Sequence, residues 1–169
     1  MPNKKPPVVL LVEDSPDDVD FARRALARSG IDHRLVVAEE GDRALALLTG
    51  EETEPGLPQP LRPALVLLDL NITGIGGREL LKRVKNDDQL RAIPVVILST
   101  SQHHLDIEGS YRAGGNAYHS KSDDLVDYQD TARRIMEYWL SAVGQAPGVA
   151  ELANEPVTTP AQQTAAAGR

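Results

Sequence analysis

The sequence contains no cysteine, which excludes a disulfide framework, a zinc-thiolate site and thiol catalysis. It also lacks any apolar run of the roughly 18 residues that a membrane-spanning helix needs. Residues 1–7 carry two lysines but no apolar core of signal-peptide length. A surplus of basic residues is missing too, because the formal net charge is −7 over 169 residues, whereas a nucleic-acid-binding domain needs a basic face. These absences predict a soluble cytoplasmic protein that binds neither nucleic acid nor membrane.

Short apolar runs that end in polar side chains are the main positive signal. Glu13 and Asp14 follow the run at residues 8–12, Asp69 follows residues 65–68, and Ser99 follows residues 95–98. Such runs are typical of strands that are buried on both faces of a parallel sheet. A bare ionised carboxylate is too costly to bury inside such a strand. The acids should therefore emerge at the carboxyl ends of the strands, which is where ligands bind in open α/β sheets.

Strand and helix patterns alternate five times along the chain. Strands are expected at residues 8–12, 35–37, 65–68, 95–98 and 117–121. Helices are expected after Ser15 as the cap, with proline in the first helical position, at 41–48, around 80–84, at 103–113, and after Ser122 as the cap. This alternation predicts an α/β fold with a doubly wound, five-stranded parallel sheet covered by helices on both faces.

The domain boundaries follow from composition. Residues 1–7 are expected to be an N-terminal extension and residues 8–143 the folded domain. Residues 144–169 have almost no large apolar side chains and are expected to be a disordered tail. Residues 50–63 contain four prolines, so we expect an exposed irregular insertion there.

The carboxylates of Glu13, Asp14 and Asp69 would crowd like charges at one edge of the sheet. A divalent cation with hard oxygen ligands relieves such crowding, and Mg²⁺ suits a site with few carboxylates. Asp69 could then attack a phosphoryl group. A hydroxyl from Ser99 or Thr100 and the ammonium of Lys121, at the end of the fifth strand, could bind the phosphoryl oxygens.

In combination these motifs are similar to those of a response-regulator receiver domain, over residues 7–143. The motifs are V-E-D at 12–14, L-L-D-L-N at 67–71, a hydroxyl at Ser99, the aromatic Tyr118 and Lys121. The resemblance implies the flavodoxin-like receiver topology and favours Ser99 over Thr100. A narrower likeness, to single-domain regulators that accompany phytochrome-type histidine kinases, is carried by residues 99–101, 121–122 and 138–140.

The resemblance also implies roles for the site residues. Asp69 would accept a phosphoryl group from a kinase phosphohistidine, and Lys121 would pair with that group. Asp14, Asp69 and the backbone carbonyl of Asn71 would bind Mg²⁺ directly, with Glu13 acting through water. Ser99 and Tyr118 would form the switch. Such a protein is not an enzyme in the usual sense, since it catalyses only its own phosphorylation and dephosphorylation.

Two departures from the family pattern and two alternative functions bear on this interpretation. The family usually has proline directly after the lysine, where this chain has Ser122, and four residues after the acceptor Asp, where it has Thr73. Thr73 lies in a loop that is rich in glycine.

A phosphorylation-independent pseudo-receiver would have the same fold. An aspartyl-phosphate phosphatase of the haloacid-dehalogenase type would need a second Asp two residues after Asp69, where this chain has Asn71.

The final helix predicts self-association. At about 100° per residue one broad stripe should pack on the sheet, made up of Leu125, Tyr128, Ala132, Ile135, Met136, Trp139 and Leu140. Tyr138 lies outside this stripe, near Thr131 and Arg134. Aromatic and arginine side chains are favoured at interfaces, and similar receivers often pair through their fourth and fifth elements. We therefore expect a homodimer through the last helix.

Overall fold

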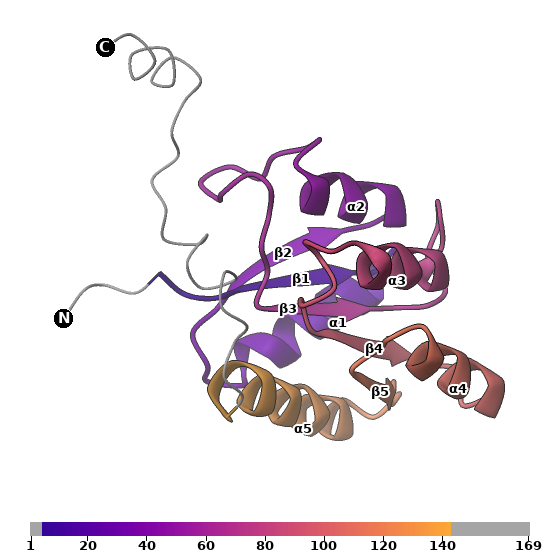
Figure 1. Ribbon diagram of the computed structural model, residues 1–169. Coiled ribbons are helices and arrows are strands. Elements are labelled where there is room, and N and C mark those ends of the chain that lie inside the picture. Colours follow the sequence, from indigo (N-terminus) through magenta and orange to yellow (C-terminus); the bar gives the residue numbers. More distant parts are fainter. Residues whose placement is uncertain (1–4, 143–169) are drawn as a thin grey trace, which may run out of the picture.

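The computed structural model describes residues 5–142 (Figure 1). The predicted tail at residues 144–169 and the first four residues of the predicted N-terminal extension lie outside the described residues. The strands are β1 (Val8–Val12), β2 (Arg34–Ala38), β3 (Leu65–Leu68), β4 (Val95–Ser99) and β5 (Ala117–Ser120). The helices are α1 (Pro16–Ala27), α2 (Gly41–Thr49), α3 (Gly77–Asn86), α4 (His104–Arg112), α5 (Leu125–Met136) and a π-helical continuation, η1 (Glu137–Ala142).

The strands form one parallel sheet in the order β2-β1-β3-β4-β5. Every residue of β1, β3 and β4 is buried, whereas β2 and β5 at the two edges are partly exposed. A strand buried on both faces requires apolar side chains at successive positions, and the three central strands have them. The predicted doubly wound, flavodoxin-like fold is confirmed.

Helices cover both faces of the sheet (Figure 1), and a cluster of buried apolar side chains lies on each face. Alternate strand residues such as Leu10 and Leu68 pack with α2 and α3 on one face. Their neighbours Leu11 and Leu67 pack with α1 and α5 on the other. Because all five strands run parallel, this packing brings their carboxyl ends to one edge of the molecule.

The start of α1 agrees with the prediction from the sequence. The hydroxyl of Ser15 accepts a hydrogen bond from the backbone N–H of Asp18 (3.4 Å), and Pro16 occupies the first turn. Proline at this position gives up only an N–H that has no partner within the helix. The cap fixes the direction in which the first turn of α1 leaves β1.

The start of α5 differs from the prediction. Asp124, and not Ser122, caps the helix, since its carboxylate accepts the N–H groups of Val126 (2.8 Å) and Asp127 (3.0 Å). Ser122 instead accepts the N–H of Asp124 in the preceding turn (3.1 Å). As the first helical residue, Leu125 is 42% exposed, so its expected place in the inward stripe is wrong. The interior of that stripe is confirmed, with these residues buried: Tyr128, Ala132, Ile135 and Met136.

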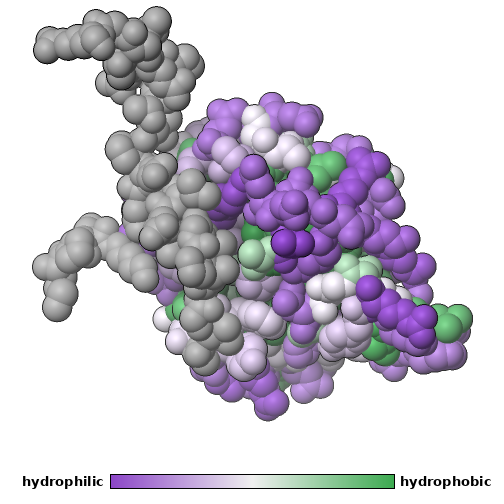
Figure 2. Space-filling view, viewed as in Figure 1, coloured by the Kyte–Doolittle hydropathy of each residue, from purple (hydrophilic) through white to green (hydrophobic). Residues whose placement is uncertain are grey.

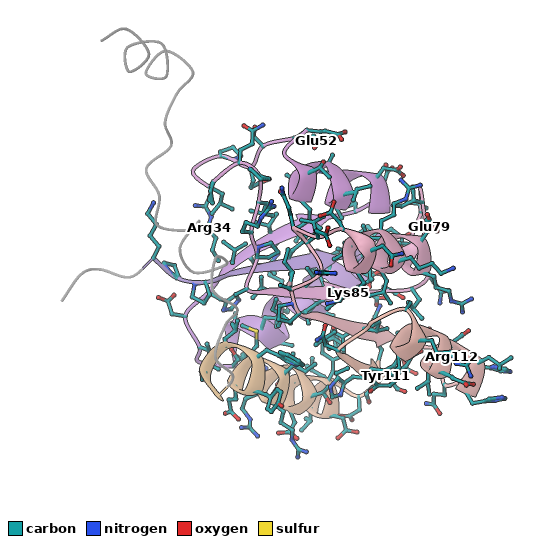
Figure 3. The ribbon with its side chains drawn as sticks, in the orientation of Figure 1. Arg34, Glu52, Glu79, Lys85, Tyr111 and Arg112 are labelled. Atoms are coloured by element: carbon teal, nitrogen blue, oxygen red, sulfur yellow. The ribbon has the colours of Figure 1, made fainter. Side chains whose placement is uncertain are left out.

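The proline-rich segment has no helix or strand between residues 50 and 64, as expected. Its expected exposure is wrong for the last part, because Leu61 is 2% and Arg62 is 8% exposed. The Arg62 guanidinium donates to the carbonyl of Leu48 at the end of α2 (2.7 Å) and to that of Leu61 (2.9 Å). On β2, Arg34 donates to the carbonyl of Gly56 (3.1 Å; Figure 3). Hydrogen bonds to backbone carbonyls therefore hold this loop against the fold.

The visible face of the molecule is mostly hydrophilic (Figure 2). Apolar residues are visible on this face near α4. Leu105, on that helix, is 59% exposed. None of the helices between residues 5 and 142 has the length and apolar character needed to span a bilayer.

Candidate phosphoacceptor site

Asp69 directly follows β3, at the carboxyl edge of the sheet, and is 7% exposed. Its Oδ1 accepts the backbone N–H of Asn71 (3.0 Å), while its Oδ2 accepts a hydrogen bond from Lys121 Nζ (2.7 Å). Lys121 comes directly after β5. Both oxygens of this buried carboxylate are thus held by donors, which fixes its orientation.

Three carboxylates surround the Lys121 ammonium. Besides Asp69 it bonds Glu13, at the end of β1, and Asp18 Oδ2, in the first turn of α1 (3.1 Å). The side chains of Lys121 and Glu13 are 7% and 3% exposed. Burial acts to lower the pKa of Lys121, but the hydrogen bonds to Asp69 and Glu13 and the negative charges of these two carboxylates together outweigh it and raise that pKa. Burial raises the pKa of the Glu13 carboxyl against the opposing pull of Lys121.

Asp14, the residue after Glu13, is not among the acids whose oxygens gather around Lys121; it bonds the loop after β3. Its Oδ2 accepts the backbone N–H of Thr73 (3.0 Å). Thr73 also accepts the N–H of Gly41 (3.2 Å), and Asp42 accepts the N–H of Ile75 (3.0 Å). The glycine-rich loop is therefore tied to β1 and to the start of α2.

Gly77 brings α3 against the acceptor. A Cβ at this position would lie 2.2 Å from the backbone oxygen of Asp69 and 2.7 Å from Leu70 Cα. Since real Cβ atoms do not approach backbone atoms so closely, only glycine lets α3 begin here.

Ser99 and Tyr118 lie on neighbouring strands: Ser99 ends β4, whereas Tyr118 pairs with Ile97, two residues before that end. Ser99 is fully buried, and its Oγ accepts the N–H of Ser101 (3.3 Å). The Tyr118 hydroxyl donates to the carbonyl of Ser101 (2.7 Å), so the ring is fixed to the β4–α4 loop. On the outer edge of β5, the backbone N–H of Tyr118 donates to the hydroxyl of Tyr111 from α4 (3.2 Å).

An ion pair links α3 to the same β4–α4 loop. Asp106, in the first turn of α4, pairs with the guanidinium of Arg78 on α3. It also accepts a hydrogen bond from the hydroxyl of Ser101 (2.5 Å). The hydrogen bond from Ser101, together with the charge of Arg78, lowers the pKa of Asp106. Sequence patterns gave no sign of this contact, since an acid in a first turn ordinarily only complements the helix dipole.

The donor set fits a hard divalent cation. Carboxylate oxygens of Glu13, Asp18 and Asp69 all lie within 4.8 Å of one another, and oxygen ligands are those that Mg²⁺ prefers. Within residues 5–142 these three acids share one cation, the ammonium of Lys121. Asp18 is a member that the sequence did not reveal, because an acid in the first turn of a helix ordinarily only complements the helix dipole.

A carboxylate held between an ammonium and a backbone N–H, with further acids around it, is suited to phosphoryl transfer. The comparison with known families is decisive. A family model described as the response regulator receiver domain matches residues 9–133. The chain belongs to the response-regulator receiver family. The resemblance predicted from the sequence motifs is confirmed, and this receiver is a phosphoacceptor protein of two-component signalling.

Individual relatives agree with this assignment. Response regulator Rcp1 of Synechocystis sp. is 39% identical over 138 residues, which span 82% of this receiver and 92% of Rcp1. The solved structure of the phosphorylated cyanobacterial phytochrome response regulator RcpA has a TM-score of 0.75 and 37% identity, covering 82% of this receiver and 97% of RcpA. The Mn²⁺-bound form of Rcp1 also has a TM-score of 0.75, with 38% identity and coverage of 83% and 99%. The predicted likeness to regulators of phytochrome pathways is therefore confirmed.

Proposed function

We propose that Asp69 is the phosphoacceptor of this receiver. Its carboxylate would attack the phosphorus of a kinase phosphohistidine, so that an O–P bond forms and the P–N bond of the donor breaks. The position of Asp69 carries this proposal: the carboxylate is buried at the strand edge, with one oxygen 2.7 Å from Lys121 Nζ. Lys121 would neutralise a phosphoryl oxygen, and by this transfer the protein would promote its own phosphorylation.

Mg²⁺ would supply charge neutralisation for the phosphoryl oxygens. We propose that Asp14, Asp69 and the backbone carbonyl of Asn71 hold it directly and that Glu13 acts through water. The carboxylate oxygens at this edge are hard ligands and fit such an ion. The Mn²⁺-bound form of Rcp1 supports a divalent-metal site in the family.

Ser99 and Tyr118 form the proposed switch. The hydroxyl of Ser99 would bind a phosphoryl oxygen. Tyr118 would report that contact, because its own hydroxyl already bonds the loop that follows Ser99 (2.7 Å to Ser101 O). A change in this loop would reach the surface of α4 and β5.

The decisive experiment is phosphorylation with acetyl phosphate and Mg²⁺, followed by intact mass. Wild type should gain one phosphoryl group and Asp69→Asn none, although this nearly isosteric variant should unfold as the wild type does. Asp17→Asn, at an exposed acid of α1, is the matched control and should be labelled normally. An unlabelled wild type would favour the pseudo-receiver alternative, and a labelled Asp69→Asn would place the acceptor elsewhere.

For partners, we infer a cytoplasmic histidine kinase of the phytochrome type, with output through protein contacts and without binding to nucleic acid or membrane. The likeness to Rcp1 and RcpA supports the pathway. Phosphotransfer from labelled candidate kinases, with acetyl phosphate as the positive control, would test it.

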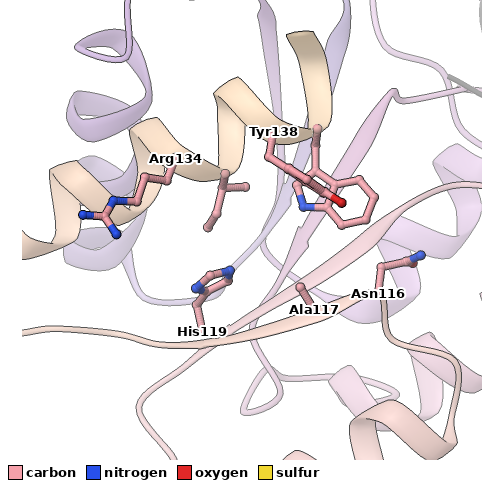
Figure 4. A pocket seen from close by; sticks show the side chains of 7 residues that line it. Asn116, Ala117, His119, Arg134 and Tyr138 are labelled. Carbon is pink, nitrogen blue, oxygen red and sulfur yellow. The ribbon is translucent and has the colours of Figure 1, made fainter. Parts of the chain in front are cut away.

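We also propose a homodimer through the last-helix region. Tyr138 is 56% exposed and lies in edge-to-face contact with Trp139, with ring centroids 5.1 Å apart. Together with Arg134 they face β5 across a pocket of about 390 Å³ (Figure 4). Exposed aromatic and arginine side chains beside a pocket suit an interface.

Sedimentation of Tyr138→Asp beside wild type tests the dimer. The introduced carboxylate should split the dimer because it would be buried without a partner. Thr53→Asp adds the same charge on the remote proline-rich loop and should sediment as the wild type. A wild type that is monomeric at high concentration, with and without phosphate, would refute the proposal.

A further inference from the structure

Asp18 contributes a contact to the site that its place in the sequence does not explain. Its Oδ2 lies 3.1 Å from Lys121 Nζ, although the two residues are 103 positions apart. Lys121 is nearly buried, with 7% of its side chain exposed, whereas the Asp18 side chain is 46% exposed. Asp18 thus reaches the ammonium from the solvent side, and Glu13 and Asp69 hold it from the interior.

The three carboxylates that hold Lys121 differ in what else they bind. Glu13 also accepts the N–H of Ser15 (3.1 Å), and Asp69 also accepts the N–H of Asn71 (3.0 Å). Within the described residues, the carboxylate of Asp18 bonds Lys121 alone. Its position is nevertheless fixed, because its backbone N–H donates to the Ser15 cap (3.4 Å).

Phosphorylation would change the competition for the Lys121 ammonium. A phosphoryl group on Asp69 brings oxygens that carry more negative charge than the carboxylate it replaces. The ammonium can follow those oxygens only if its other contacts weaken. The contact with Asp18 opposes this movement, because it holds the ammonium toward the solvent side and away from the strand edge. The charge of Asp18 also repels the phosphoryl group itself, but so does that of any other acid nearby.

We propose that Asp18 is a positioning residue that holds Lys121 back from the phosphoryl group and so weakens the phosphorylated state. The inference rests on the proposed function, since it takes Lys121 as the partner of the phosphoryl group on Asp69. Asp18 acts through Lys121 and touches neither donor nor acceptor in the transfer.

The test is the dissociation constant of beryllofluoride, a phosphoryl mimic, measured at saturating Mg²⁺ by tryptophan fluorescence or by NMR. Asp18→Asn should bind it roughly two- to fivefold more tightly than wild type, as expected for the loss of a half-exposed ion pair. Asp17→Asn is the matched control, because it removes the same charge from the same helical turn but lies outside the Lys121 contacts. Its affinity should stay within experimental error of the wild type.

A second pair of variants shows whether the effect passes through Lys121. In a Lys121→Ala background, Asp18→Asn should no longer tighten binding relative to Asp17→Asn. Equal tightening by Asp17→Asn and Asp18→Asn in the wild-type background would overturn the inference, since it would leave only long-range repulsion. An extra tightening by Asp18→Asn that persists in the Lys121→Ala background would overturn it as well, since the effect would not pass through Lys121. Weaker binding by Asp18→Asn would also overturn it. Should Lys121→Ala bind too weakly to measure, the comparison of the two single variants still decides.

Failure of the proposed function would look different. A wild type that binds no beryllofluoride and takes no phosphoryl group from acetyl phosphate would contradict the assignment of Asp69. A wild type that does both, with Asp18→Asn indistinguishable from Asp17→Asn, would contradict the role of Asp18 alone.

Discussion

Replacing Gly77 with alanine should disturb the acceptor without changing any functional side chain of the site. The added Cβ would lie 2.2 Å from the backbone oxygen of Asp69 and 2.7 Å from Leu70 Cα. Both obstacles are backbone atoms, so no side chain can rotate out of the way. Either α3 must retreat or the end of β3 must move.

The size of the effect follows from that overlap. Carbon and oxygen atoms normally approach to about 3.3 Å, so the two elements must separate by roughly 1 Å. Overpacking of this kind typically costs about 1–3 kcal/mol. For a domain of this size the melting temperature should fall by roughly 4–12 °C. Because the displaced atoms belong to Asp69 and its neighbour, labelling by acetyl phosphate should also slow.

Thermal unfolding followed by circular dichroism, with labelling rates on the same samples, measures both effects. Gly109→Ala is the matched control: it lies in α4, where an added Cβ would meet nothing within 4 Å. Removing a glycine from a helix interior should stabilise the protein by roughly 0.5–1 kcal/mol. If the melting temperature of Gly77→Ala equals or exceeds that of the wild type, the reasoning about this close approach is wrong.

Three further outcomes are expected. Asp124→Ala should destabilise the fold by about 1 kcal/mol in urea titrations, with Ser122→Ala costing clearly less, because Asp124 caps α5; the reverse order would restore Ser122 as the cap. Burial lowers the pKa of Lys85 from 10.5 to about 8, so between these values the unfolded chain binds more protons. The stability of wild type relative to Lys85→Met should therefore rise as pH increases through that window, and a falling difference would contradict it. Calorimetric Mg²⁺ titration should show a larger loss of affinity for Asp14→Ala than for Glu13→Ala, since a direct ligand contributes more than one acting through water; the opposite ranking would exchange their roles.

The strands could be predicted because their signal is local. In β1, β3 and β4 successive apolar residues stop abruptly at a polar one, and a parallel sheet buried on both faces permits little else. The same rule, applied to the amino-acid sequence alone, puts Glu13, Asp69 and Ser99 at one edge. Lys121 could be added because it ends the last strand pattern.

The features that escaped prediction depend on distant contacts. Ser122 and Asp124 are both good capping residues, and the choice between them depends on how α5 packs against α1 and the sheet. Arg62 lies in a proline-rich loop that was expected to be exposed, yet its guanidinium binds the carbonyl of Leu48 near the end of α2. Asp18 has the ordinary pattern of a first-turn acid, and only the fold brings it to Lys121.

The hydroxyl of Tyr111 has a consequence for how copies of this chain can associate. β5 is an outer strand of the sheet, and an open strand edge is a template on which another chain can add a strand. Here a side chain of α4 already occupies the N–H of Tyr118 (3.2 Å). An incoming strand would have to displace that hydroxyl and the helix that carries it. The open edge of β5 is thereby partly protected against the growth of a continuous sheet, which has no natural end.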